Sequence, residues 1–274
     1  MNCRFCKTKL VHVFVDLINA PISNDFLSTD ELNNVEVFYP LKTLSCSECK
    51  LVQVGSFRNP SELFKKDYVY FSSFSTSWLD HSKKYVDMIT SRLSLDEKSL
   101  VTEIASNDGY LLQYFKENNI PCIGIEPTPN TAKVAREKGI EVLEDFFGKE
   151  FAGTLKKSDL ILGNNVLAHV PDINDFVSGL KIALKENGTI TMEFPHLMEL
   201  IDKNQFDTIY HEHFSYFSFH TVNQIFEHHG LKVYDVEQIQ THGGSLRIYA
   251  THSENDKLSN TISRADLINK EKEF

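Results

Sequence analysis

Four of the five cysteines form two C-x-x-C pairs, Cys3 with Cys6 and Cys46 with Cys49. Each pair offers two thiolates from one turn, and four thiolates can close a tetrahedral shell around Zn²⁺. In a reducing compartment such pairs are more typical of metal sites than of disulfides. The spacing therefore predicts a structural Zn²⁺ with no open catalytic position, and redox pairs or chance spacing are the alternatives.

A small module is expected around these cysteines. Strand-like runs occupy residues 11–17 and 35–41, between the two pairs. A segment this short buries little apolar core, so zinc, worth ~10–16 kcal/mol in small peptides, would supply much of its folding energy. We therefore expect a zinc ribbon over residues 1–55, whereas Cys122 lies alone in an apolar run and is expected in a core.

Polar residues follow two apolar runs further along the chain. The run at 99–106 leads into Asn-Asp-Gly, where Gly109 lets a ligand approach the backbone. The loop lacks the G-x-G-x-x-G pattern of dinucleotide-binding folds. The run at 122–127 ends at Glu126 and Pro127, and a carboxylate there can accept both hydroxyls of a ribose, unless it is only a solvated charge.

A third run, at 159–165, ends at Asn165 and leads to Ala168 and His169. Strands of an open parallel sheet end at one edge, which lines the ligand crevice. We expect Asn165 and Ala168 to flank a ligand at this edge. His169 is as readily a buried core histidine.

The elements that position these residues alternate from residue 98 onward between short apolar runs and helical stretches, which is typical of a parallel sheet with crossover helices. The remaining strands are expected at 141–145, 189–195, 232–239 and 245–252, with helices at 110–118, 129–138, 172–185 and 219–229. The last two strands are joined by a loop too short for a helix, so the last strand should run antiparallel. The sequence predicts an α/β fold with a Rossmann-like seven-stranded sheet, six strands parallel and one antiparallel.

Composition narrows the functional classes. Of 274 residues, 41% are hydrophobic and 24% charged, which is ordinary for a folded soluble protein. We find no apolar run near the ~18 residues of a membrane span and no signal-peptide core, so we expect a cytoplasmic protein without a membrane partner. The net charge of −10 argues against nucleic-acid binding, which usually requires a basic surface.

Four parts are expected along the chain. A zinc-binding module spans 1–55, a linker with a helical cleft segment spans 56–97, the seven-stranded domain spans 98–252, and 253–274 are polar and helical in composition. Within the linker, Tyr68 and Tyr70 either lie over a ligand or pack between two domains.

Together these motifs resemble the sugar-nucleotide C-methyltransferases, which methylate a carbon of a deoxy-4-keto-hexose carried on a nucleoside diphosphate. The resemblance rests on the paired C-x-x-C motifs, DYVYFSSFS, EIASNDG, GIEP, NNVLAHV, EFP followed by FDTIYHEHFSYFS, and HGGSLR. It implies an S-adenosylmethionine-dependent methyltransferase sheet, a structural Zn²⁺ and a nucleotide-linked 4-keto-deoxy sugar as substrate. Family members usually carry a further C-terminal α/β domain, so 253–274 are expected to begin a truncated region. A non-catalytic protein that binds S-adenosylmethionine or a sugar nucleotide is the alternative.

The resemblance also implies two sets of site residues. The set expected at S-adenosylmethionine is Ser106, Asn107, Asp108, Gly109, Glu126, Pro127, Asn165 and Ala168. The set expected to be catalytic at the sugar is Tyr210, Glu212 and His213, with His213 as the base.

The chemistry explains why these residue types are suitable. A carbon beside a ketone becomes nucleophilic only when a base removes its proton and a donor stabilises the enolate oxygen. Histidine, with an unperturbed pKa of ~6.5, can be the neutral base, which suits His213. We prefer Tyr210 as the donor, with His211 or a water as alternatives, and Glu212 either orients His213 or binds a sugar hydroxyl.

Other interpretations of this segment remain. His211 and His213 could chelate a second metal from one strand face, although two ligands are short of a shell, or both could be surface histidines. We count His211 with Tyr68, Tyr70 and Arg247 as expected substrate contacts. Arg247 either pairs with a phosphate or is a charge at the sheet edge.

Overall fold

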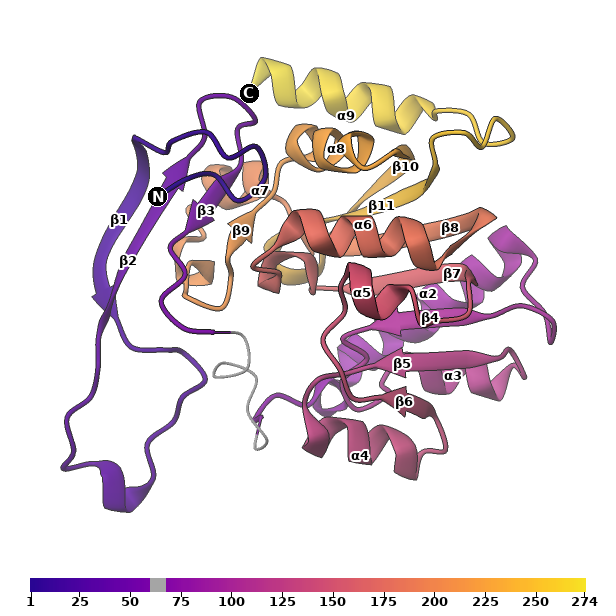
Figure 1. The fold of residues 1–274 in the computed structure, drawn as a ribbon, viewed down its shortest axis with the longest axis horizontal. Helices are drawn as coiled ribbons and strands as arrows, with labels where there is room; N and C mark the ends of the chain where they lie inside the picture. Colours follow the sequence, from indigo (N-terminus) through magenta and orange to yellow (C-terminus); the bar gives the residue numbers. More distant parts are fainter. Residues whose placement is uncertain (60–67) are drawn as a thin grey trace.

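The computed structural model describes residues 1–59 and 68–274. Residues 60–67, part of the expected linker 56–97, lie outside the described residues. Two sheets make up the framework, a seven-stranded one and a four-stranded one (Figure 1).

The larger sheet has the strand order β10-β11-β8-β7-β4-β5-β6. β11 is antiparallel to both of its neighbours and every other adjoining pair is parallel, so six strands share one direction, as predicted. The strands are β4 (Val101–Ile104), β5 (Cys122–Ile125), β6 (Glu141–Leu143), β7 (Ser158–Asn164), β8 (Leu184–Pro195), β10 (Leu231–Ile239) and β11 (Ser245–His252).

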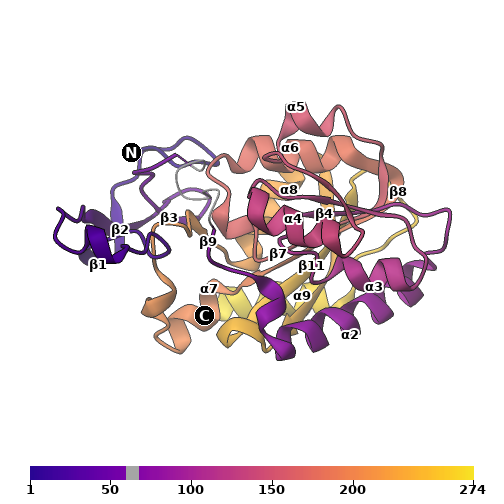
Figure 2. The same cartoon turned by 90° about the horizontal axis from the view of Figure 1, so that it is seen from below.

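Helices cover both faces of this sheet (Figures 1 and 2). Successive buried residues of β7 face opposite ways, since Leu160 and Leu162 join one apolar cluster and Ile161 joins the other. Burial on both faces explains the near-continuous apolar runs in the sequence. One cluster includes α2 (Thr76–Leu93), α3 (Leu112–Glu117) and α4 (Pro129–Glu137), and the other includes α5 (Lys149–Ala152), α6 (Ile173–Ala183) and α8 (Phe219–His228).

The ends of these helices follow the polar residues of the sequence. Asp172 caps α6 by accepting hydrogen bonds from two backbone N–H groups of the first turn. Gly230, just after α8, has a φ of 70°, a conformation that glycine adopts at little cost. Short helical turns complete the chain at η1 (Thr29–Glu31), η2 (Ser72–Phe74), η3 (Leu167–His169), η4 (Phe206–Thr208), η5 (Thr241–Gly243) and α7 (Leu197–Asp202).

The smaller sheet joins the N-terminal module to the rest of the chain. It is antiparallel and ordered β1 (His12–Ala20), β2 (Tyr39–Ser45), β3 (Val52–Val54) and β9 (Ser215–Tyr216). Its fourth strand therefore follows the expected catalytic segment directly. The strand expected at 35–41 begins only at Tyr39, because pairing with β1 starts at Ala20 opposite Tyr39.

The C-terminal residues pack on the same body. α9 (Ile262–Glu273) lies against α8 and β10, and Leu267 is buried there. The Glu271 carboxylate accepts hydrogen bonds from the backbone N–H groups of Phe219 and His220 at the start of α8, at 2.6 and 2.8 Å. A carboxylate is favoured at a helix N-terminus. None of the helices in the described residues is long and apolar enough to cross a membrane.

Candidate active site

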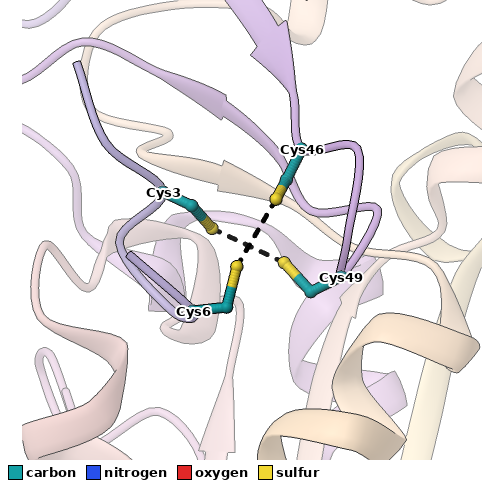
Figure 3. Close-up of side chains that lie close together, drawn as sticks. All are labelled: Cys3, Cys6, Cys46 and Cys49. Carbon is teal, nitrogen blue, oxygen red and sulfur yellow. Dashed lines mark hydrogen bonds between the residues drawn. The ribbon is translucent and has the colours of Figure 1, made fainter. Parts of the chain in front are cut away.

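The four paired cysteines converge on one point, as Figure 3 shows. Their sulfur atoms all lie within 4.8 Å of one another, with 3.5 Å between Cys3 and Cys49 and 3.4 Å between Cys6 and Cys46. Sulfurs around a tetrahedral Zn²⁺ at about 2.3 Å would be roughly 3.8 Å apart, so the donor set fits this ion. The Gln53 amide also donates to the Cys3 sulfur at 3.3 Å, a contact that orients a metal ligand.

The zinc-site loops rest on the larger domain. Thr221 of α8 donates to the Cys49 carbonyl at 3.1 Å, and Asn174 of α6 donates to the Phe5 carbonyl at 2.9 Å. The metal site therefore fixes the N-terminal module against two helices of the seven-stranded domain.

A cavity of about 590 Å³ lies at the carboxyl edge of the larger sheet. This volume is in the range of small-molecule sites. We call two parts of its lining the strand-edge wall, formed at the ends of β4, β5 and β7, and the loop wall, formed by Asn24, Tyr210, Glu212 and His213. The strand-edge wall consists of Ile104, Ala105, Asn107, Ile125, Glu126, Pro127, Asn164, Asn165, Val166 and Ala168.

The first loop of the strand-edge wall has an unusual backbone. Ala105, Asn107 and Gly109 have φ values of 55°, 48° and 73°. A Cβ on Gly109 would lie 2.5 Å from the Ile140 side chain, so only glycine fits there. This turn directs the Asn107 N–H toward the Glu126 carboxylate, with a hydrogen bond of 2.8 Å.

Glu126 is almost fully buried yet lines the cavity. Burial raises the pKa of its carboxyl, and donors from Thr128 and Asn107 oppose that change. The Thr128 N–H donates at 2.9 Å. An oriented carboxylate at the end of the second strand is suited to accept hydroxyl donors from a ligand.

Three residues expected at the cofactor, among them Gly109 of the turn, lie beneath the wall instead of on it. Ser106 and Asp108 are fully buried, and neither lines the cavity. Asp108 accepts hydrogen bonds from Ser73 and lies 3.8 Å from the Lys138 ammonium group, whereas Ser106 fills the space left by the missing side chain of Gly124. Both support the turn.

Several residues of the cavity lining were not among those expected from the sequence. Asn164 is 9% exposed, and among the described residues neither atom of its amide has a hydrogen-bond partner. Buried amides normally have partners, so a ligand is the natural partner here. The loop after β6 also lines the cavity through Asp145, Phe146 and Phe147, and no spacing pattern in the sequence predicts this. Trp78 of α2 and His242 of η5 line it as well.

The linker tyrosines meet both walls. Tyr68 and Tyr70 line the cavity, and the Asn107 amide donates to the Tyr70 carbonyl at 3.0 Å. Burial raises the pKa of both phenols. They therefore stay protonated and can donate hydrogen bonds.

On the loop wall, the hydrogen bonds of His213 define its tautomer. Its Nδ1 lies 2.9 Å from the Thr208 carbonyl, which can only accept, so Nδ1 carries the proton. Nε2 is then the basic atom, and the Tyr210 hydroxyl donates to it at 2.7 Å. Burial, with His169 nearby, lowers the pKa of His213 well below its usual value and keeps the ring neutral.

His169 joins the two walls. Its Nδ1 donates to the Glu212 carbonyl at 2.9 Å, and its ring meets that of His213 edge to face with centroids 4.7 Å apart. Burial lowers the pKa of His169 to about 4. The segment after β7 is thus in direct contact with the expected catalytic residues.

The remaining histidine of the YHEH segment, His211, does not line the cavity. His211 is buried, donates to the Pro40 carbonyl at 3.2 Å and packs its ring against Tyr39 of the N-terminal module and Phe57 of the linker. Within the described residues, the cysteine cluster is the only group of three or more side chains suited to hold a metal, so an H-x-H metal site has no further ligands there.

Arg247 lies apart from this cavity. It is buried in β11, donates to Glu193 at 2.7 Å and to Glu237 at 2.8 Å, and lines a separate hollow of about 540 Å³ with His81 and Lys84. Two carboxylates already balance its charge.

Comparisons with known proteins agree with this arrangement. Residues 3–64 match a family described as "Putative zinc binding domain", and residues 75–236 match one described as "Methyltransferase domain". The C-methyltransferase NovU of Streptomyces niveus is 34% identical over 253 residues, which is 91% of this chain and 60% of that protein. The chain thus spans less than two thirds of the length of this relative.

Solved structures share the fold at low identity. A SAM-dependent methyltransferase from Archaeoglobus fulgidus is 17% identical with a TM-score of 0.52, over 63% of this chain and 93% of that one. The magnesium protoporphyrin IX methyltransferase of Synechocystis PCC 6803, with bound SAH, is 14% identical with a TM-score of 0.51, over 65% of this chain and 83% of that one.

Proposed function

Because this chain belongs to the S-adenosylmethionine-dependent methyltransferases, we propose that it methylates a carbon beside the ketone of a nucleotide-linked 4-keto-deoxy sugar. The name of the relative from Streptomyces niveus supports transfer to carbon. The observation that carries the proposal is the position of a neutral histidine base and a tyrosine donor in the same cavity as Glu126.

Residues of the strand-edge wall would hold the methyl donor. Glu126 would accept the ribose hydroxyls, and the turn at Ala105 and Asn107, which lines the cavity, would let the methyl donor approach the backbone closely. Bound S-adenosylmethionine supplies an electrophilic methyl group on a sulfonium. The four cysteines would hold Zn²⁺ in a closed shell of thiolates, which leaves no position for a substrate and gives the ion a structural role.

Residues of the loop wall would prepare the carbon that receives the methyl group. Nε2 of His213 takes the proton from the carbon next to the ketone, and the positive ring is stabilised by the Thr208 carbonyl at Nδ1. Tyr210 then donates its hydrogen bond to the developing enolate oxygen instead of to Nε2. The electron pair left on carbon would form the new C–C bond to the methyl group as the S–CH3 bond of the donor breaks, with its electron pair remaining on sulfur and S-adenosylhomocysteine as the leaving group.

Product analysis tests this proposal. The chain is incubated with a methyl-labelled donor and a panel of nucleotide-linked keto-sugars, and mass spectrometry follows the product while NMR follows exchange of the sugar proton with solvent. We expect a labelled sugar in which the label is on carbon. Cofactor binding without a product from any sugar would instead favour a protein that only binds its ligands.

A further inference from the structure

The carboxylate of Glu212 is held by the N-terminal module. The Asn24 amide donates to both of its oxygens, at 3.0 and 2.8 Å, and the Ser23 hydroxyl donates to one of them at 3.2 Å. Both donors lie in the connection between β1 and β2, 188 positions away from Glu212 in the case of Asn24.

The contact is situated in the cavity itself. Asn24 and Glu212 both line it, although only 1% of Glu212 is exposed. A carboxylate so deeply buried needs donors to remain charged. Burial raises the pKa of Glu212, and the hydrogen bonds from Asn24 and Ser23 oppose that rise.

The backbone around Glu212 depends on the same region. Its carbonyl accepts the hydrogen bond from His169, and the neighbouring His213 has its ring against that of His169. A shift of Glu212 therefore reaches the two histidines as well as the carboxylate. Packing alone would not require two side-chain donors to meet one carboxylate in the cavity lining.

We propose that Asn24, assisted by Ser23, is a positioning residue through which the N-terminal module fixes the direction and the ionised state of the Glu212 carboxylate on the loop wall. This inference rests on the proposed function for its catalytic consequence. The contact itself is independent of which sugar is bound. Asn24 acts through Glu212 and takes no part in proton or methyl transfer.

Graded variants of the zinc-loaded chain test the idea. Asn24→Ala removes both amide contacts, Ser23→Ala removes one hydroxyl contact, and Asn24→Asp places a second carboxylate beside Glu212. Asn19→Ala is the matched control, because Asn19 is exposed in the same module. Thermal unfolding and affinity for S-adenosylmethionine identify any variant that fails to fold.

Two readouts separate the outcomes. The first is the pKa of the Glu212 carboxyl, followed by ¹³C NMR of labelled glutamate and assigned by the signal lost in Glu212→Gln. The second is the pH profile of kcat/KM for the keto-sugar. We expect Asn24→Ala to raise this pKa, to move the acid limb to higher pH and to lower kcat/KM roughly 10- to 100-fold at neutral pH, as for lost hydrogen bonds to a charge.

The variants should follow a fixed order. Asn24→Asp raises the pKa furthest because two like charges cannot both ionise at contact distance, Ser23→Ala raises it least, and Asn19→Ala leaves it unchanged. An unchanged pKa and pH profile in both Asn24→Ala and Ser23→Ala would overturn the proposal. If wild type makes no product from any keto-sugar but the pKa still shifts in this order, the positioning contact stands and the proposed function fails.

Discussion

The two walls of the cavity are built in different ways. The strand-edge wall comes from residues 104–168 of one sheet, and its main contacts, such as that between Asn107 and Glu126, stay within that span. The loop wall combines Asn24 with Tyr210, Glu212 and His213, and it is held by the pairing of β3 with β9 and by the hydrogen bond from His211 to the Pro40 carbonyl. One wall needs only the seven-stranded sheet, and the other needs two modules in contact.

This difference suggests a division of tasks. A pocket formed by strand ends is as stable as the sheet that carries it. A wall assembled from segments distant in sequence can be lost while the sheet survives, because local opening follows the least stable contacts. Binding of the methyl donor and preparation of the sugar should therefore respond separately to perturbation.

Removing zinc should have the largest effect. Because the ion is worth ~10–16 kcal/mol in small peptides, the stripped module should unfold and turnover should fall to background. S-adenosylmethionine should still bind, since no cysteine ligand lies on the strand-edge wall. Metal analysis gives the zinc content, calorimetry gives the affinity for S-adenosylmethionine, and product formation gives the turnover. Readdition of Zn²⁺ should restore turnover. The control Cys122→Ser, outside the cluster, should retain both turnover and affinity for S-adenosylmethionine. If removal of zinc lowered the affinity for S-adenosylmethionine as much as turnover, the distinction between the two walls would be lost.

His213→Gln should have the next largest effect. Loss of a general base lowers rates by roughly 10²- to 10⁴-fold, so both proton exchange and methyl transfer should fall by that factor. Affinity for S-adenosylmethionine should be unchanged. His220→Gln, exposed on α8, is the matched control. Wild-type exchange rates in His213→Gln would assign the base to another residue.

Glu126→Gln should affect the opposite wall. Hydrogen bonds from two ribose hydroxyls to a charged acceptor would be replaced by weaker ones, which predicts an affinity for S-adenosylmethionine lower by roughly 10- to 100-fold. The KM for the sugar should change little. Calorimetry should show the same fold-loss of affinity for S-adenosylmethionine and for 5′-methylthioadenosine, because both ligands carry the ribose. The control Glu141→Gln, exposed on β6, should leave both affinities unchanged.

The same contrast separates what the sequence predicts from what it does not. Apolar runs buried on both faces predicted every strand of the larger sheet, and the polar ends of those runs predicted Asn107, Glu126 and Asn165 at its edge. The run at 99–106 ends early, at Ile104, because Ala105 and Asn107 adopt positive φ. Local sequence patterns were sufficient to predict the strand-edge wall because its residues and their main contacts lie within residues 104–168.

The smaller sheet and the loop wall depend on contacts that no local pattern encodes. β3 and β9 have three and two residues, too few for a periodicity; β3 pairs with β2 and β9, and β9 pairs with β3, which is distant in sequence. Val35 is 93% exposed although its run favours a strand, since the pairing partner of β1 begins at Tyr39. The contact between Asn24 and Glu212 likewise becomes visible only once the modules meet.

Acid should weaken the loop wall first, with the smallest of these effects. Folding lowers the pKa of His169 to about 4, so below about pH 6.5 the unfolded chain binds a proton that the folded chain does not. The free energy of unfolding should therefore decrease as the pH is lowered, by up to about 1.4 kcal/mol per pH unit for this group. The lowered pKa of His213 acts in the same direction, whereas the raised pKa values of Glu126 and Glu212 act in the opposite direction, because the folded chain then binds those protons more readily.

Urea unfolding between about pH 6.5 and 5 measures this slope, with zinc content followed in the same samples. His169→Gln should reduce the slope, because glutamine takes up no proton. His220→Gln, whose ring is on the surface, should retain it. An equal slope in His169→Gln and wild type would mean that acid acts elsewhere, and the loop wall would then be no more sensitive to protons than the sheet edge it faces.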